Sequence, residues 1–139
     1  MALPARLLPL VGVLVATVGV AATAALPAGV ANGRLHVRQV LAKNTPLPVE
    51  GAIPVVAIVR RDGSPVGKRR LGLVRPSATF SLSPGRYRLL SWQRVCDGNC
   101  GILDPPSDRC SRAFTLHRNE RLRATITVRY GSGCRISFG

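Results

Sequence analysis

Most of the side chains that could do chemistry lie close together in the sequence. The single tryptophan, Trp92, is followed by four oxygen-bearing side chains and two arginines: Asp97, Asn99, Asp104, Asp108, Arg109 and Arg112. Carboxylate and amide oxygens gathered in one loop are ligands that Ca²⁺ accepts. The spacing matches no EF-hand loop, however, and the two arginines offset the carboxylates. We therefore expect neither a metal ion nor a cofactor at this position.

The sequence carries no recognisable catalytic motif. It contains neither G-x-S-x-G nor H-E-x-x-H, and its histidines are His36 and His117. His117 and Glu120 are three residues apart on a predicted turn, but no nucleophile accompanies them. The acidic residues are too few, in a chain this small, to predict a paired-carboxylate glycosidase site. We expect a non-enzymatic protein, with a small secreted inhibitor or enzyme as an alternative.

Three of the four cysteines lie in this same segment. The four are Cys96, Cys100, Cys110 and Cys134. An even number of cysteines behind an export signal predicts two disulfides, and the absence of a paired C-x-x-C knuckle argues against zinc. Four cysteines allow three connectivities. The favoured one is Cys100–Cys110 with Cys96–Cys134, and the main alternative is Cys96–Cys110 with Cys100–Cys134.

The segment from Cys96 to Cys110 is predicted to be an exposed, rigid loop. Asp97-Gly98, Asn99 and Asp104-Pro105-Pro106 are turn-forming or chain-stiffening residues. Rigid exposed loops lose little conformational entropy on binding, and loops often carry function. The candidate contact surface is therefore this loop with its flanks: Trp92, Asp97, Asn99, Asp104, Asp108, Arg109 and Arg112. The competing interpretation is that the loop only connects two strands and is held by a disulfide, with Trp92 packed beneath the loop or on a sheet.

The segment before the loop must position it. Phe80 and Leu82 alternate with polar residues, Ser83-Pro84-Gly85 signals a tight turn, and Tyr87 and Leu89 resume the alternation. This pattern predicts a β-hairpin whose four large side chains lie in the core. By the same parity, Trp92 faces outward.

The F-x-L-x-P-G-x-Y-x-L pattern of this segment resembles the central hairpin of carboxypeptidase-regulatory-like, or prealbumin-like, β-sandwich domains. The matching residues are Phe80, Leu82, Pro84, Gly85, Tyr87 and Leu89. The sequence departs from the family where Pro76-Ser77-Ala78 replaces the Asp-Gly turn often found there. Because these domains are small, extracellular and generally non-catalytic, the resemblance implies a non-catalytic sandwich.

Short apolar or alternating segments along the rest of the chain predict further strands. They are expected at residues 33–42, 53–59, 68–74, 113–116, 122–130 and 134–138. Short strands at this regular spacing are typical of an all-β sandwich. We expect residues 32–139 to form a small immunoglobulin- or prealbumin-like β-sandwich of about seven strands with two disulfides.

Residues 1–31 are predicted to be an export signal. Arg6 precedes an apolar segment, and Ala22-Thr23-Ala24 and Gly29-Val30-Ala31 are candidate cleavage sites. The alternative is an uncleaved anchor helix through residues 7–26, which is long enough to span a bilayer. Either way, we expect a secreted or extracytoplasmic protein, membrane-anchored in the second case.

The chain is strongly basic, with a formal net charge of +14. Such a charge attracts polyanions, and an exported chain without a nucleic-acid-binding motif is not expected to bind nucleic acid. The partner stays unknown, with an anionic envelope polymer or another surface protein as candidates. Our leading prediction is a secreted or cell-envelope binding module that uses the loop at 96–110. The alternative from a different class is a basic structural envelope protein held by charge to anionic wall or lipid polymers.

Overall fold

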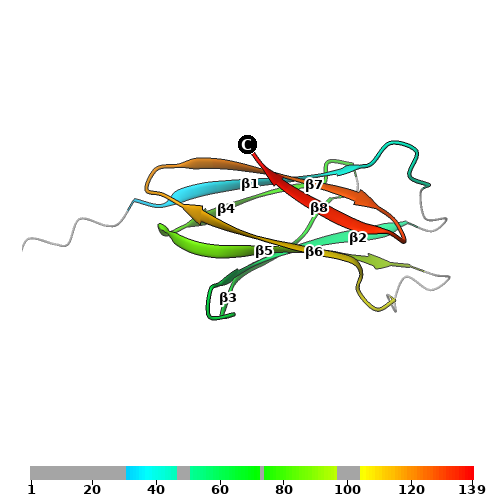
Figure 1. The fold of residues 1–139 in the computed structure, drawn as a ribbon, viewed down its shortest axis with the longest axis horizontal. Helices are drawn as coiled ribbons and strands as arrows, with labels where there is room; N and C mark the ends of the chain where they lie inside the picture. Colours follow the sequence, from blue (N-terminus) through cyan, green and yellow to red (C-terminus); the bar gives the residue numbers. More distant parts are fainter. Residues whose placement is uncertain (1–30, 47–50, 73, 97–103) are drawn as a thin grey trace, which may run out of the picture.

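The computed structural model describes residues 31–46, 51–72, 74–96 and 104–139 of the chain (Figure 1). Within them it has eight strands: β1 (Gly33–Leu41), β2 (Ala52–Arg60), β3 (Pro65–Arg70), β4 (Ser77–Leu82), β5 (Gly85–Val95), β6 (Ser107–Leu116), β7 (Arg121–Arg129) and β8 (Gly133–Phe138). The predicted export signal lies outside the described residues, apart from its last position. In the described part of the chain, no helix is long and apolar enough to cross a membrane.

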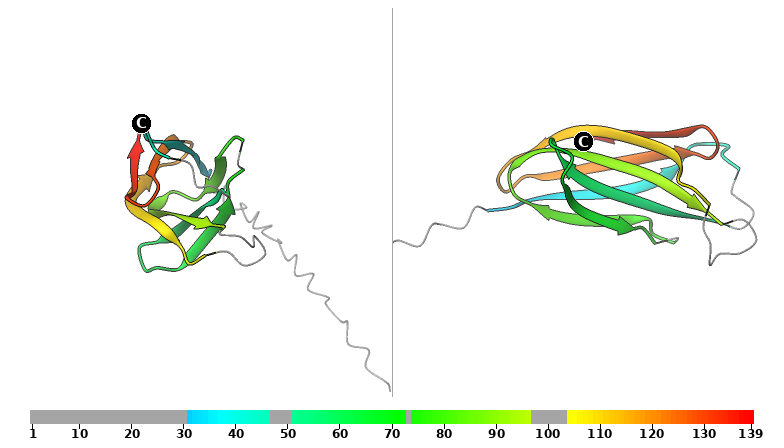
Figure 2. Two further views of the ribbon diagram at one scale, coloured as in Figure 1. Left: turned by 90° about the vertical axis from the view of Figure 1, so that its right-hand side faces the viewer. Right: turned by 90° about the horizontal axis from the view of Figure 1, so that it is seen from below.

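The strands form two four-stranded sheets that pack face to face. The first sheet has the order β4-β1-β7-β8 and the second has the order β3-β2-β5-β6. All pairs are antiparallel except β1 with β7, which run parallel. Figure 2 shows the strands of both layers grouped around one interior. The all-β sandwich expected from the strand pattern is therefore confirmed, with eight strands in place of about seven.

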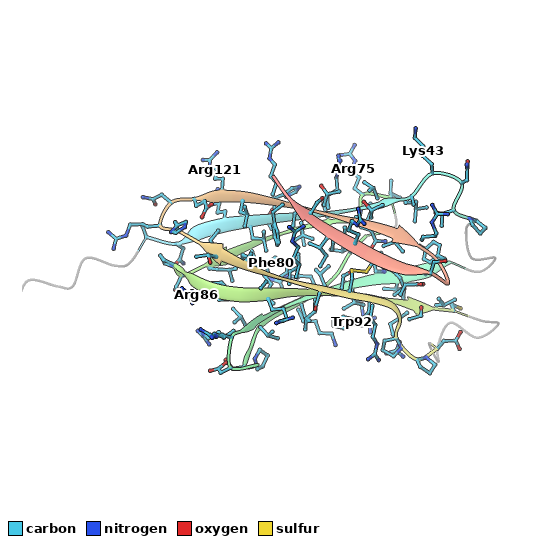
Figure 3. All side chains as sticks on the ribbon, in the orientation of Figure 1. Lys43, Arg75, Phe80, Arg86, Trp92 and Arg121 are labelled. Carbon is cyan, nitrogen blue, oxygen red and sulfur yellow. A yellow bond between two sulfur atoms is a disulfide. The ribbon has the colours of Figure 1, made fainter. Side chains whose placement is uncertain are left out.

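The period-two alternation of the sequence selects the core. Inward residues of both sheets form one apolar cluster, in which Leu35, Ile58, Leu89 and Ile126 are fully buried. The core positions predicted around the Pro-Gly turn are correct, because Phe80, Leu82, Tyr87 and Leu89 are all buried. Phe80 lies between the two layers in Figure 3.

The predicted hairpin is wrong in its pairing, although its strands exist. β4 pairs with β1 in one sheet, whereas β5 pairs with β2 and β6 in the other. The Ser83-Pro84-Gly85 turn therefore carries the chain from one sheet to the other. Alternation reveals which side chains point inward but not which strand lies alongside, so the same pattern fits both arrangements.

The favoured disulfide connectivity is also wrong. The described disulfide joins Cys110 to Cys134, with a Cα–Cα distance of 5.4 Å. This pairing excludes both Cys100–Cys110 and Cys96–Cys134, and it excludes the main alternative as well. Cys96 also takes part in a disulfide, whose other half lies outside the described residues. The Cys110–Cys134 bond connects β6 to β8 and so fastens the two sheets along one edge of the sandwich.

Two predicted strand boundaries are displaced. The strand expected at 68–74 is β3, which begins at Pro65 and ends at Arg70 because it pairs with β2 directly after the Asp62-Gly63 turn. The strand expected to begin at Ala113 begins at Ser107. The last residues of the predicted 96–110 loop, including Cys110, are therefore part of β6 and not of an exposed loop.

Candidate functional site

A hollow of about 580 Å³ lies on the outer face of the second sheet, between β3, β5 and the start of β6. Its wall includes Leu90, Trp92 and Pro106 together with three cations, Lys68, Arg94 and Arg109. Among the described residues, no acidic side chain lines it. The hollow thus combines an apolar surface with an excess of positive charge.

Trp92 is the one aromatic side chain among the described residues that line this hollow. It faces outward from β5, as parity predicted, and is partly exposed. Its backbone lies opposite Val55 of β2, which is buried although it faces outward. The Lys68 ammonium lies 5.3 Å from the centre of the indole ring. Part of the ring therefore packs on its own sheet, while the rest remains open to the hollow.

A β-bulge in β6 sets the direction of two neighbouring side chains. Ser91 pairs with Cys110 and Gln93 pairs with Ser107, so the backbones of two residues, Asp108 and Arg109, lie opposite the single residue Trp92. Asp108 has a positive φ of 46°, and its Oδ1 accepts a hydrogen bond of 2.9 Å from the Gly133 N–H of β8. Arg109 instead lines the hollow. Bulges commonly re-aim side chains in this way.

The residues predicted as one contact surface are therefore divided. Trp92 and Arg109 reach the hollow, whereas Asp108 and Arg112 bind the neighbouring strand β8. Arg112 donates a hydrogen bond of 2.7 Å to the Ile136 carbonyl and lies over the Phe138 ring. These two contacts help to close the edge of the sandwich. Asp97, Asn99 and Cys100 lie outside the described residues.

Asp104 forms its described hydrogen bonds to β5 through its backbone. Its N–H donates to the Val95 carbonyl at 3.0 Å, and its carbonyl accepts a hydrogen bond of 2.6 Å from Arg94 Nε. These contacts attach the described end of the predicted loop to β5. The sequence did not lead to the prediction of Arg94 or Lys68 as residues of this surface. Arg94 could have been found, because strand alternation places it on the same outward side of β5 as Trp92.

The histidines do not join a catalytic group among the described residues. His36 Nδ1 lies 3.1 Å from Thr79 Oγ1 on the outer face of the first sheet. The Glu120 carboxylate accepts a hydrogen bond of 2.6 Å from the backbone N–H of His117, which holds the β6–β7 turn. No group of three or more His, Cys, Asp or Glu side chains that could hold a metal occurs in the described segments.

The outer face of the first sheet is a second basic surface. Arg34, His36 and Arg38 face outward from β1, and Arg121 and Arg123 do so from β7. We call these five residues the arginine face. The sequence did not predict this gathering of charge, because only the parallel pairing of β1 with β7 brings these residues together.

These features define a disulfide-linked, basic β-sandwich that carries a mixed apolar and cationic hollow beside Trp92. Comparisons of the chain with protein-family models, curated proteins and solved structures found no match.

Proposed function

We propose that the protein is an extracytoplasmic, non-enzymatic binding module whose contact surface is the Trp92 hollow. The observation that carries the proposal is the partly exposed indole within a concave surface lined by Lys68, Arg94 and Arg109. Aromatic and arginine side chains in concave sites are the side chains that contribute most binding energy. Such a surface suits an anionic ligand that also has a flat or apolar part.

Two further features support this proposal. Disulfides persist in oxidising compartments, which agrees with an exported protein. The residues around the Pro84-Gly85 turn resemble prealbumin-like and carboxypeptidase-regulatory-like domains, which are generally non-catalytic. The proposed fold type is accordingly a prealbumin-like or immunoglobulin-like sandwich. The proposed contact surface is the Trp92 hollow and not the whole loop at 96–110 that the sequence predicted.

The test uses the indole itself as the reporter, because Trp92 is the only tryptophan in the chain. The purified protein is titrated with glucuronate, glucose 6-phosphate and benzoate while tryptophan emission is recorded. We expect a saturable change with at least one probe. Calorimetry should then show an affinity about tenfold lower for Trp92→Ala and Arg109→Ser, since each removes one contact of hot-spot type.

Arg86→Ser is the matched control, because Arg86 is exposed on the same strand at the far end of the same layer (Figure 3). It removes one positive charge and should leave the affinity unchanged. An emission that no probe changes would overturn the proposal. Equal loss of binding in Arg109→Ser and Arg86→Ser would also overturn it, because net charge and not the hollow would then account for binding.

A further inference from the structure

The arginine face concentrates positive charge on the outer face of the first sheet. The parallel register places Arg34 beside Arg121 and His36 beside Arg123. Like charges on neighbouring strands destabilise a sheet. No outward-facing position of the four strands in this sheet carries an acidic residue. The fold therefore retains an arrangement that a bound polyanion would stabilise.

The acidic side chains with described contacts are engaged elsewhere. Asp62 binds Ser64, Asp108 binds the Gly133 N–H, and Glu120 binds the His117 N–H. Each of these contacts lies in a turn or at the edge between sheets. Asp62 and Asp108 therefore lie away from the arginine face, whereas Glu120 lies at its end, directly before Arg121 and with its carbonyl bonded to the Arg34 N–H.

The face also carries a hollow and a set of hydroxyl groups. The hollow has a volume of about 670 Å³, and its wall includes the side chains of the arginine face with Thr79, Thr125 and Ser137. Guanidinium groups form paired hydrogen bonds with carboxylate, sulfate and phosphate groups. Serine and threonine hydroxyls donate and accept hydrogen bonds. Together these groups match a polymer that carries both anionic and hydroxyl groups.

We propose that the arginine face binds an acidic polysaccharide. Membrane-surface binding depends on large apolar side chains that enter the lipid interface. In the described residues of these four strands, the exposed large apolar side chain is Leu41, which lies at the end of β1 and outside the hollow. Binding of single-stranded nucleic acid depends on aromatic rings on which bases stack. The aromatic residue that lines this hollow, Phe138, already packs against Phe114 and lies under the Arg112 guanidinium. Charge and hydroxyl groups remain as the means of recognition, and an acidic polysaccharide offers partners for both.

The test compares four probes on the purified protein: polygalacturonate, heparin, a single-stranded DNA oligonucleotide and vesicles containing phosphatidylglycerol. We expect the two polysaccharides to bind more tightly than the DNA and the vesicles at equal ionic strength. Replacing Arg34, Arg121 and Arg123 together by Thr, which suits a strand, should weaken polysaccharide binding about tenfold or more. The salt dependence should also become shallower, because fewer ions are released on binding.

The matched control replaces Arg60, Arg61 and Arg86 by Thr. All three are exposed, and none lies on the arginine face. This control loses the same net charge, so it should retain most of the binding. Equal weakening in both triple variants would overturn the proposal, as would tighter binding of the vesicles or the DNA.

A second measurement does not depend on a variant that folds. An arginine-selective dicarbonyl reagent is applied to the unaltered protein with and without polygalacturonate, and the modified sites are mapped by mass spectrometry. We expect Arg34, Arg121 and Arg123 to be protected while Arg60 and Arg86 are not. Uniform protection, or none, would contradict a defined site.

This proposal is independent of the one for the Trp92 hollow, and the two can fail separately. Arg121 and Trp92 extend from opposite layers in Figure 3. Polysaccharide on the arginine face should therefore leave tryptophan emission unchanged, and Trp92→Ala should leave polysaccharide affinity unchanged. If polysaccharide changes the emission and Trp92→Ala abolishes its binding, the Trp92 hollow is the site and the arginine face is not.

Discussion

The Tyr87 hydroxyl donates a hydrogen bond of 2.7 Å to the backbone carbonyl of Ser83. The two residues lie on either side of the Pro84-Gly85 turn, where the chain passes from β4 in one sheet to β5 in the other. The ring itself packs against Phe114 in the core, with 5.6 Å between centroids. One side chain thus fixes both the packing of β5 and the geometry of the passage between sheets.

Tyr87→Phe should lower the free energy of unfolding by about 1 kcal/mol, the usual net contribution of one such hydrogen bond. Urea unfolding measures this change. Ser83→Ala is the control background. Because the acceptor is the Ser83 backbone oxygen, Tyr87→Phe should lower the free energy of unfolding by the same amount in that background. If Tyr87→Phe costs nothing in either background, the hydrogen bond does not stabilise the turn.

A buried pair of amides connects the two sheets near the other end of the sandwich. Gln93 Nε2 of β5 donates a hydrogen bond of 2.9 Å to Gln39 Oε1 of β1, and Gln93 is fully buried. Gln93 Oε1 has no hydrogen-bond partner among the residues that the structure describes. Gln39→Leu alone should cost about 1–3 kcal/mol, because it leaves the Gln93 amide buried without a partner.

Gln39→Leu combined with Gln93→Leu should be close to neutral or stabilising, because neither side chain of the pair then leaves a polar group unsatisfied. A double-mutant cycle based on chemical unfolding measures the difference. If the loss of stability in the double variant equals the sum of the losses in the two single variants, the two amides do not stabilise each other.

Peptide mapping can check the Cys110–Cys134 connectivity directly. Trypsin cleaves after Arg109 and Arg112, and after Arg129 and Arg135, so Cys110 and Cys134 fall in separate short peptides. A non-reduced digest should contain residues 110–112 linked to residues 130–135. Either connectivity considered in the sequence analysis would instead link both short peptides to residues 95–109, which carry Cys96 and Cys100.

Removing the same disulfide should destabilise the sandwich substantially. The two cysteines are separated by 24 residues, and the chain-entropy model gives a contribution of about 3 kcal/mol for a loop of this size. The paired substitution Cys110→Ala and Cys134→Ala, compared with the oxidised protein by chemical unfolding, tests this value. Unchanged stability would mean that β6 and β8 stay together without the covalent bond.

Tyr130 should titrate above its ordinary range. Burial raises the pKa of this phenol above 10.0, and the negative charge of Asp108 raises it further. A raised pKa in the folded state stabilises the protein at pH values below the unfolded pKa, and this stabilisation is lost as the pH rises through the folded pKa. Stability should therefore fall in the alkaline range above pH 10.

Absorbance titration of the phenolate, assigned with Tyr130→Phe, measures this pKa. Asp108→Asn should lower the pKa of Tyr130 only in part, because burial remains the larger cause. The Asn side-chain oxygen can still accept the hydrogen bond from Gly133, so the bulge should persist. A Tyr130 phenol that titrates at or below 10.0 would contradict the prediction.

The sequence alone determined the class of fold and the inward face of most strands. Alternation placed Phe80, Leu82, Tyr87 and Leu89 in the core, and all four are buried. The same alternation placed Trp92 on the outward side of β5, where the hollow lies. These features follow from side-chain periodicity, which is a local property of a strand.

Only the tertiary structure decided which strands are neighbours and which cysteines meet. The turn at Pro84-Gly85 joins two sheets, and Cys110 reaches Cys134 because β6 and β8 are the facing edges of those sheets. The arginine face exists because β1 and β7, far apart in sequence, run parallel and side by side. The bulge that separates Asp108 from Arg109 likewise depends on the register between β5 and β6. Strand pairing is a long-range choice made by packing of the whole core, and a period of two residues carries no information about it.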